Sequence, residues 1–261
     1  MSNIAAKKTE VETGTPPQKS ITGRIWQWRV APNHIGTALS QKLGLPEVVG
    51  RILATRVADA ASGRHFLEPT LADLPDPCDL KGVKEGAERL AQAVLDGEKI
   101  VVFGDYDVDG SCGSALLMRY FQWVTQECNS APSLYIPDRL SEGYGPNPDA
   151  MAKIAADGGQ VVVTVDTGSV AFEAFEKAQD LGLEVVITDH HQTQSAFPPC
   201  VALINPNRMD ETTPHTNLAG AGVAFMLLLA TNRCLREQGY FKDKQEPDLR
   251  QLLDLVAIAS V

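Results

Sequence analysis

Short apolar runs rich in Val and Ile recur along the chain, and stretches with apolar residues at helical spacing lie between them. Runs of this length and β-branched content predict buried strands. The predicted strands cover residues 99–104, 133–137, 160–165, 184–188 and 201–204. Because strands alternate with helices, the pattern predicts an α/β fold, in which a mostly parallel sheet is flanked by helices and joined by right-handed crossovers.

The predicted helices occupy the segments between the strands. In the first, Val83, Ala87, Leu90 and Val94 recur at the spacing expected for one face of a helix. Gly182 follows a later helix, and glycine is the common residue just past a helix end. The other helices are expected near residues 111–125, 151–155, 170–181 and 222–234.

The chain divides into three parts. Residues 1–20 are rich in Lys, Thr, Glu and Pro and are expected to be disordered. Residues 21–80 carry helical patterns that end in a Pro-rich connection, which predicts a helical N-terminal leader. Residues 81–261 hold all of the predicted strands. The last residues, 257–261, lie within an apolar run, so we expect the chain to be a truncated piece of a longer one.

Acidic residues and histidines directly follow three of the predicted strands. They are Asp105, Asp107 and Asp109 after strand 99–104, Asp166 after strand 160–165, and Asp189, His190 and His191 after strand 184–188. The carboxyl ends of parallel strands meet at one edge of a sheet, so these side chains are expected to gather there. The first three alternate along an extended or turning segment, and this spacing places alternate side chains on one side. Crowded carboxylates repel one another unless a cation compensates, and oxygen and nitrogen ligands suit Mn²⁺ or Mg²⁺. The pattern therefore predicts a metal-dependent hydrolase that acts on a phosphate ester.

Each cluster also has a simpler interpretation. The three aspartates fit a solvated loop, whereas an EF-hand calcium loop is excluded because its twelfth position is Leu116 rather than Glu. Asp166 alone would more often cap a helix than bind a metal. The Gly-rich segments 141–145 and 218–225 fit either backbone contacts to a phosphate, or a turn and close helix packing. Three other histidines lack such context and are expected to be structural or surface residues: His34, His65 and His215.

The composition limits the class of protein. The 261 residues are 44% hydrophobic and 21% charged, with no apolar run long enough for a membrane helix and no signal-peptide pattern. The five cysteines form no CxxC pair, which argues against zinc knuckles and disulfides and favours a reduced, cytoplasmic protein. The net charge of −10 argues weakly against a broad nucleic-acid-coating surface. It does not exclude a nuclease, because bound divalent ions and local residues such as Arg139 and Arg208 add positive charge.

Taken in order, the motifs resemble those of a known family. GDYDVDG, VTVDTG and TDHH are similar to the first three motifs of the DHH phosphoesterase superfamily. Four further segments narrow the resemblance to the RecJ single-strand-specific exonucleases: FLEPTLADLPDP, PDRLSEGYG, INPN and LAGAGVAF. The resemblance extends from about Ile21 to Val261, which is nearly the whole chain outside the tail.

This resemblance implies a binuclear site for two Mn²⁺ or Mg²⁺ ions. By motif match, the ligands would be Asp105, Asp107, Asp109, Asp166 and His190. His191 would contact the scissile phosphate, and Asp189 would orient the histidines. The implied reaction is 5′-to-3′ hydrolysis of single-stranded DNA to nucleoside 5′-monophosphates by two-metal catalysis, in DNA recombination and repair. Single-stranded DNA is the implied partner, single-strand-binding protein and helicases are further candidates, and no membrane partner is expected.

One part of the family pattern is missing from the sequence. The fourth motif, which supplies one more Asp ligand, is expected just after Val261, and Asp254 is not its equivalent. The family's second DHH-associated domain and its oligonucleotide-binding domain have no counterpart either. Two alternatives stay open. One is a DHH phosphodiesterase of short oligonucleotides or cyclic dinucleotides, or a pyrophosphatase. The other is an inactive DHH-fold scaffold, against which the three intact motifs argue.

Overall fold

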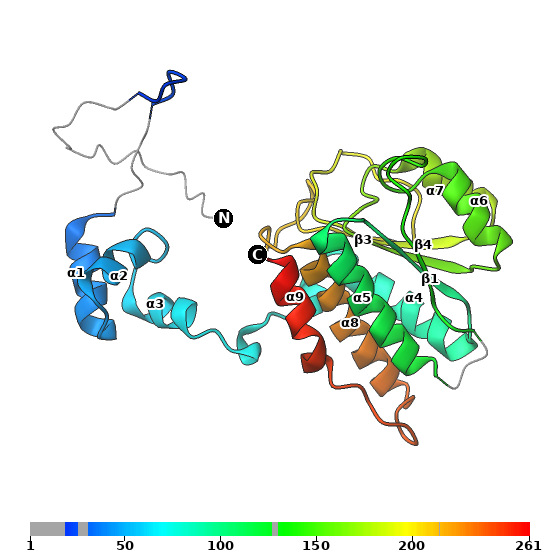
Figure 1. The fold of residues 1–261 in the computed structure, drawn as a ribbon. Coiled ribbons are helices and arrows are strands. Elements are labelled where there is room, and N and C mark those ends of the chain that lie inside the picture. The colour runs from blue at the N-terminus through cyan, green and yellow to red at the C-terminus, as the bar shows by residue number, and fades with distance from the viewer. Residues whose placement is uncertain (1–18, 26–30, 127–129, 214) are drawn as a thin grey trace. The chain divides into compact units, whose positions relative to one another are not determined.

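The computed structural model describes residues 19–25, 31–126, 130–213 and 215–261 (Figure 1). The chain forms two compact units, residues 1–74 and residues 75–261. The boundary predicted near residue 80 lies a few residues beyond this division. The predicted disordered tail, residues 1–20, falls almost entirely outside the described residues, and of its two described residues Lys19 pairs with Ile25 in an isolated antiparallel bridge.

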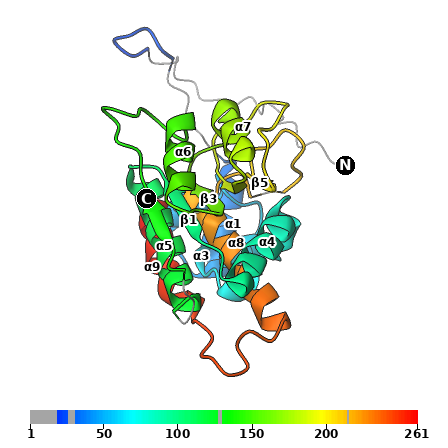
Figure 2. The same ribbon diagram turned by 90° about the vertical axis from the view of Figure 1, so that its right-hand side faces the viewer.

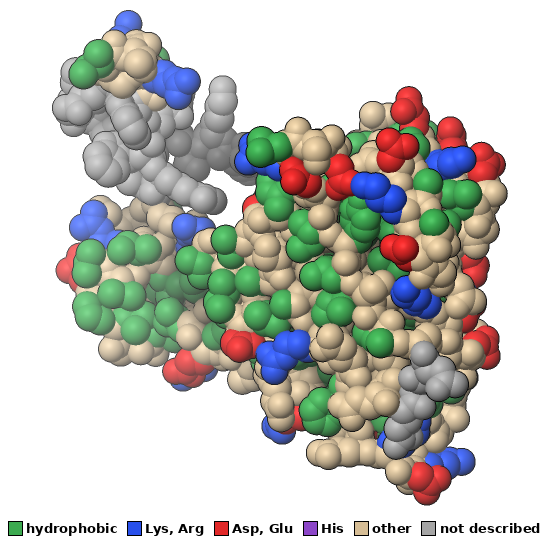
Figure 3. Space-filling view, turned by 45° about the vertical axis from the view of Figure 1, so that its right-hand side comes forward, with side chains coloured by type: hydrophobic (Ala, Val, Ile, Leu, Met, Phe, Trp, Pro, Cys, Tyr) green, Lys and Arg blue, Asp and Glu red, His purple; other side chains and the backbone are tan. Residues whose placement is uncertain are grey.

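The N-terminal unit is helical, as its sequence pattern predicts. Its described residues form the helices α1 (Asn33–Leu43), α2 (Glu47–Leu53), α3 (Ala60–Leu67) and the short 3-10 helix η1 (Leu71–Asp73). Two glycines let α1 and α2 approach closely, since a Cβ at Gly50 would lie 2.5 Å from the Gly36 carbonyl oxygen. The unit exposes many apolar side chains, which are visible at the left of Figure 3. This exposed set includes Val48, Ile52, Phe66 and Leu71.

In the described part of the second unit, five parallel strands form one sheet. They are β1 (Ile100–Gly104), β2 (Ser133–Tyr135), β3 (Val161–Val165), β4 (Glu184–Thr188) and β5 (Ala202–Ile204). Their order across the sheet is β2-β1-β3-β4-β5, and every neighbouring pair is parallel. The predicted α/β class with a mostly parallel sheet is therefore confirmed.

Helices cover both faces of this sheet (Figure 2). They are α4 (Val83–Asp96), α5 (Val108–Val124), α6 (Pro148–Ala156), α7 (Phe172–Asp180), α8 (Gly220–Glu237) and α9 (Leu253–Ala259), with the 3-10 helices η2 (Pro77–Asp79) and η3 (Leu249–Leu252). Alternation of side chains along the strands divides the core in two. Ile100 and Val102 of β1 pack with α4, α5 and α8, whereas Val101 and Phe103 pack with α6 and α7. Each such buried side chain contributes about 1.5–3 kcal/mol to stability.

The start of α5 differs from the sequence prediction. The helix begins at Val108 rather than at residue 111, because the Asp107 side chain accepts the Gly110 N–H and caps it. Asp109 therefore lies in the first helical turn. Of the extended or turning segment expected for the three aspartates, the structure shows a turn that leads into the helix, because local capping by Asp107 begins α5.

Other element ends differ by a few residues. α7 spans Phe172–Asp180, so Val170 and Leu181 lie outside it and are 51% and 38% exposed. β2 ends at Tyr135, and Pro137 beyond it has no N–H for a strand ladder. α8 begins at Gly220, two residues before its predicted start. Within the described residues, no helix has both the length and the apolar character needed to cross a bilayer.

The direction of the connections reverses between β1 and β3. After β1 the chain passes through α5 on one face of the sheet, and after β3 it passes through α7 on the other. In parallel sheets, ligands bind in the crevice that opens at such a switch point, outside the carboxyl ends of the strands. The residues predicted to form the site follow β1, β3 and β4, so the fold brings them to this edge.

Candidate metal centre

Asp105 and Asp107 lie in the turn that joins β1 to α5. Asp107 caps the helix, with its Oδ1 accepting the Gly110 N–H at 3.0 Å. The turn is so tight that a Cβ at Gly110 would lie 2.5 Å from the Asp105 Cβ, so only glycine fits there. Asp105 is 5% exposed, and burial raises the pKa of its carboxyl. Two neighbouring carboxyl groups are therefore held together at the edge of the sheet.

Asp166 follows β3 in an unusual backbone conformation. Its φ of 61° is the only positive value among the described residues other than glycine. The side chain is buried, and its Oδ1 accepts no well-formed hydrogen bond. Burial raises the pKa of Asp166 to about 6, and the carboxylates of Asp109 and Asp107 act in the same direction. A strained backbone together with an unsatisfied buried carboxylate is typical of a functional site.

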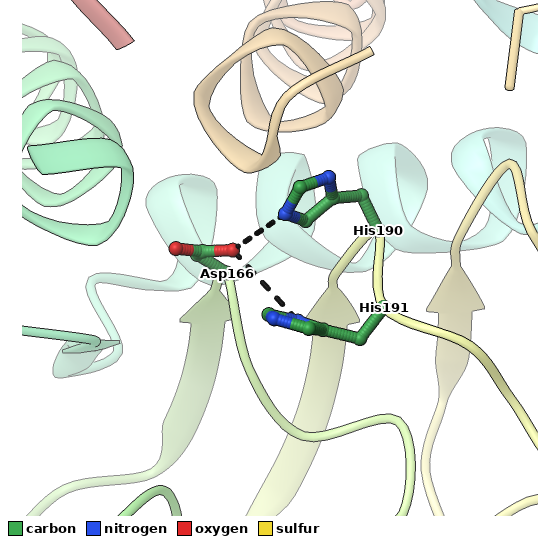
Figure 4. A group of neighbouring side chains, drawn as sticks. All are labelled: Asp166, His190 and His191. Carbon is green, nitrogen blue, oxygen red and sulfur yellow. Dashed lines mark ion pairs between the residues drawn. The ribbon is translucent and has the colours of Figure 1, made fainter. Parts of the chain in front are cut away.

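The two histidines after β4 point at the Asp166 carboxylate (Figure 4). His190 Nε2 lies 3.1 Å from Asp166 Oδ1, and His191 Nδ1 lies 3.9 Å from the same oxygen. The hydrogen bond with Asp166 raises the pKa of His190. Imidazole nitrogens and a carboxylate oxygen therefore converge on one small volume, which is the arrangement a cation site requires.

Asp189 holds the histidine segment in place. Its Oδ1 accepts the backbone N–H groups of His190 and His191, at 2.7 Å and 3.1 Å, and lies 2.8 Å from His191 Nδ1. Its Oδ2 accepts the Ser169 N–H at 2.9 Å. Although burial acts in the opposite direction, the hydrogen bonds from His191 and Ser169 lower the pKa of Asp189 to about 2. The hydrogen bond between Asp189 and the His191 ring raises the pKa of His191 to about 9. This geometry supports the prediction that Asp189 orients the histidines.

The side chains form two donor groups that share one residue. Asp105, Asp107 and Asp166 each place a donor atom within 4.8 Å of the others, and so do Asp166, His190 and His191. Three crowded carboxylates, two of them buried, repel one another and are stabilised by positive charge between them. This mixture of oxygen and nitrogen donors suits Mn²⁺ or Mg²⁺. The residues present therefore fit two divalent ions, with Asp166 common to both groups. No other described histidine joins either group.

Asp109 has different partners. Its Oδ2 accepts the Gly220 N–H at 2.6 Å and its Oδ1 accepts the Ala221 N–H at 2.7 Å, so the carboxylate binds the first turn of α8. It also lies 3.5 Å from His190 Nε2. Asp109 belongs to neither of the two donor groups found among the described residues. Its role as a metal ligand therefore stays a prediction.

The Gly-rich segment 218–225 is used for close packing. A Cβ at Gly220 would lie 2.7 Å from the Asp166 Cβ, so the first turn of α8 lies directly against the end of β3. The N–H groups of Gly220 and Ala221 bind Asp109 and are therefore not free for a phosphate. Segment 141–145 forms a turn, in which Gly143 and Gly145 have φ values of 84° and 73°. Packing and turn formation thus describe both segments, and backbone contacts to a phosphate stay a prediction for segment 141–145.

Comparison with known proteins places this site in a family. Residues 99–260 match the DHH family, N-terminal domain. The matched range begins at the strand before the first aspartate cluster and contains both donor groups. The chain belongs to the DHH family. The membership inferred from the three motifs is thereby confirmed.

This DHH-family chain is similar to RecJ exonucleases over most of its length. It is 38% identical to the single-stranded-DNA-specific exonuclease RecJ of Bacillus subtilis over 225 residues, which cover 86% of this chain and 26% of that protein. It is 37% identical to RecJ of Escherichia coli over 219 residues, which cover 83% of this chain and 37% of that protein. The chain therefore spans between 26% and 37% of the length of these two relatives.

Two solved RecJ structures resemble the DHH-family fold described above. RecJ from Thermus thermophilus in complex with Mn²⁺ superposes with a TM-score of 0.65 at 25% identity, covering 89% of this chain and 31% of that one. An exonuclease RecJ bound to manganese superposes with a TM-score of 0.59 at 31% identity, covering 73% of this chain and 44% of that one. The resemblance to RecJ found in the sequence is thus confirmed.

Two asparagines after β5 support His190 and His191, a role that the hydrophobic pattern of the sequence did not predict. Asn205 is fully buried, and its Nδ2 donates to Ser169 Oγ at 2.8 Å and to the His191 carbonyl at 2.9 Å. Asn207 donates its N–H to Asn205 Oδ1 at 2.8 Å and its side-chain amide to the His190 carbonyl. The only sequence signal for this support was the INPN segment directly after a predicted strand.

Aromatic and basic side chains border the metal centre. The Tyr144 ring lies 6.4 Å from both the His191 ring and the Tyr106 ring, edge to face in each case. The guanidinium of Arg139 lies 5.1 Å over the Tyr106 ring. Arg208, the other local cation suggested by the sequence, is engaged in a salt bridge and in a hydrogen bond to a carbonyl of β5. Of these two arginines, Arg139 is therefore the better placed to add positive charge beside the metal centre.

Proposed function

We propose that the protein containing this chain is a 5′-to-3′ exonuclease that hydrolyses single-stranded DNA to nucleoside 5′-monophosphates by two-metal catalysis. The observation that carries the proposal is the pair of donor groups sharing Asp166 at the switch point of the sheet. The substrate named for the RecJ relatives supports the choice of single-stranded DNA. The Mn²⁺ bound in similar RecJ structures supports the choice of metal.

The donor residues have distinct positions in this proposal. Asp105, Asp107, Asp166 and His190 would hold two Mn²⁺ or Mg²⁺ ions, with Asp109 as a further ligand. When bound, such ions stabilise the charge that develops on a phosphate and activate water as the nucleophile. Asp166 would contribute to both ions, because it belongs to both donor groups. Its burial keeps competing water away from the carboxylate.

His191 would contact the scissile phosphate. Asp189 binds its Nδ1 at 2.8 Å, so the opposite ring nitrogen, Nε2, is left to donate to a phosphate oxygen. The side chain of His191 is 51% exposed, which makes it reachable by a substrate. Asp189 would thus act through His191, by fixing the orientation of the ring.

Three residues at the border of the site are placed to contact the strand itself. The rings of Tyr106 and Tyr144 offer faces on which bases of any identity can stack, and Arg139 offers donors to a backbone phosphate. Such contacts suit a sequence-independent single strand, because the bases of a duplex are already stacked on one another.

The proposal extends to the setting of the reaction. We place the enzyme in DNA recombination and repair and in the cytoplasm, with single-strand-binding protein and helicases as candidate partners. The RecJ relatives are much longer than this chain, so these features belong to the full-length protein that contains it.

A substrate panel tests the proposed function. The full-length protein is incubated with Mn²⁺ and, in separate reactions, a labelled single strand, the same strand in a duplex, a dinucleotide and pyrophosphate. We expect mononucleotides to be released from the 5′ end of the single strand alone. Cleavage only of the dinucleotide or of pyrophosphate would overturn the proposal and favour a different DHH phosphoesterase.

Asp107→Asn is the matched inactive control for this panel. Asn caps a helix as well as Asp does, so the variant keeps the start of α5 while it removes one charged donor. We expect kcat/KM to fall by at least about a hundredfold, while the melting temperature of the metal-free protein stays unchanged. Activity that survives this change would come from a contaminant or from a different site.

A further inference from the structure

The loop between β2 and α6 brings two side chains to the metal centre. Tyr144 lies beside His191, and Arg139 lies over Tyr106. Within the loop, Asp138 Oδ1 accepts the N–H groups of Leu140 and Ser141, but Leu140 is 97% exposed and two loop residues are glycines with positive φ. Contacts with the rest of the fold therefore hold its side chains at the centre, and the side-chain hydrogen bond between Tyr144 and Thr167 is one of them.

Glu142 also ties this loop to the fold. Its Oε1 accepts the Tyr135 hydroxyl at 2.8 Å and is paired with the Lys153 ammonium, and its Oε2 accepts the Asp138 N–H at 3.0 Å. Its own N–H donates to the Asp138 carbonyl at 2.7 Å. The hydrogen bond from Lys153, followed by those from Asp138 and Tyr135, lowers the pKa of Glu142 to about 2. The carboxylate is thus ionised and fully engaged.

The partners of Glu142 are themselves rigid. Tyr135 ends β2, and its ring stacks on Phe103 of β1 at a centroid distance of 5.4 Å. Lys153 belongs to α6, whose Met151 and Ile154 are buried against the sheet. Glu142 therefore connects the loop to a strand on one side and to a helix on the other.

We propose that Glu142 is a positioning residue that holds Tyr144 and Arg139 at the metal centre and so determines how tightly the DNA strand binds. It acts through the loop and touches neither metal nor substrate. This inference rests on the proposed function, because it assigns Tyr144 and Arg139 to contacts with the single strand.

The simpler interpretation is that Glu142 and Lys153 form a surface ion pair that does not position the loop. Such surface ion pairs contribute little to folding stability. Glu246 offers a matched control for this interpretation. Glu246 pairs with Arg236 and accepts the Asn232 amide, so it also ties a connecting segment to a helix. Asn232 lies twelve residues after Gly220 along α8, about 18 Å from the end of the helix that adjoins the centre. Glu246→Gln therefore removes a similar ion pair far from the proposed strand contacts.

The kinetic test compares Glu142→Gln, Lys153→Met and Glu246→Gln in the full-length protein. For Glu142→Gln we expect KM for single-stranded DNA to rise about tenfold while kcat changes less than about threefold, with an unchanged dissociation constant for Mn²⁺. Lys153→Met removes one of the contacts of Glu142 and should raise KM by less. Glu246→Gln should leave KM unchanged. An unchanged KM in Glu142→Gln, or an equal rise in Glu246→Gln, would overturn the proposal.

A second measurement reports on the loop without any catalysis. Trypsin cleaves after Arg139, and mass spectrometry follows the appearance of that peptide end in the native protein. We expect this cut to be several times faster in Glu142→Gln than in wild type and Glu246→Gln, because the loop opens more often. An inactive wild-type enzyme would refute the proposed function, whereas equal tryptic rates would refute the anchoring by Glu142.

Discussion

At Asp166, three unfavourable features coincide in one residue. Its φ is positive, its carboxylate is buried, and its Oδ1 accepts no hydrogen bond of good geometry, although His190 Nε2 lies 3.1 Å away. Each feature costs about 1–3 kcal/mol of folding free energy in the metal-free protein. A divalent ion would offset the second and third, because it gives the buried carboxylate a positive partner. Metal binding and folding stability are therefore expected to be coupled at this residue.

Asp166→Asn tests that coupling. Asn visits the left-handed region as Asp does and has almost the same size, so the variant removes the charge and little else. We expect its metal-free form to be about 1–2 kcal/mol more stable than wild type, and we expect most of the stabilisation by Mn²⁺ to be lost. Urea unfolding with and without Mn²⁺ measures both effects. Asp157→Asn, at an exposed position, is the control, and a wild-type response to Mn²⁺ in Asp166→Asn would contradict the role assigned to Asp166.

The residue types of the site were visible in the sequence, but their partners were not. Asp105, Asp107 and Asp166 gather as predicted, because the carboxyl ends of parallel strands share an edge. The Gly220 N–H that binds Asp109 comes from a residue 111 positions later in the chain. Hydrophobic periodicity reports which face of an element is buried, and it cannot report a contact between the first turns of two helices so far apart in the chain.

At the scale of elements, the first turn of α8 packs against the end of β3. A Cβ at Gly220 would meet the Asp166 Cβ at 2.7 Å and its Cα at 3.0 Å, and neither atom can move without shifting the strand end. We expect Gly220→Ala to destabilise the protein by about 1–3 kcal/mol through overpacking. It should also weaken Mn²⁺ binding, since it displaces Asp166. Urea unfolding and a Mn²⁺ titration measure the two effects.

Gly222→Ala is the control within the same helical turn. A Cβ at Gly222 would meet only the Leu218 side chain, at 3.3 Å, and that side chain can move. Alanine favours a helix over glycine by up to about 1 kcal/mol, so this variant should be as stable as wild type or more so. Equal stability of Gly220→Ala and Gly222→Ala would mean that the first turn of α8 is not packed closely against Asp166.

The elements themselves were predictable to different degrees. β1, β3 and β4 are buried on both faces, so their continuous apolar runs identified them within about a residue. The start of α5 was misplaced because Asp107 combines two functions, a predicted metal ligand and an actual helix cap. When one residue is both a helix cap and a predicted metal ligand, a prediction based on only one of these roles misplaces the start of the helix.

At the scale of the whole molecule, the two units carry opposite net charge. Residues 1–74 contain nine Lys and Arg against six Asp and Glu, whereas residues 75–261 contain fourteen against twenty-seven. The net charge of −10 is therefore the sum of a basic unit and a strongly acidic one. The argument against a nucleic-acid-coating surface applies to the acidic unit alone. Divalent ions at its centre would reduce the repulsion between its carboxylates and DNA phosphates.

Metal binding is accordingly expected to stabilise the second unit and not the first. Every residue of both donor groups lies within residues 75–261. At a Mn²⁺ concentration one hundred times the dissociation constant, linkage predicts about 2.7 kcal/mol of added stability. Hydrogen–deuterium exchange measured with Mn²⁺ and again with excess EDTA should show slower exchange in β1, β3 and β4, and unchanged exchange in α1, α2 and α3. Equal protection of those three helices would mean that the two units unfold together. Unchanged exchange in β1 and β3 would contradict a metal centre at their ends.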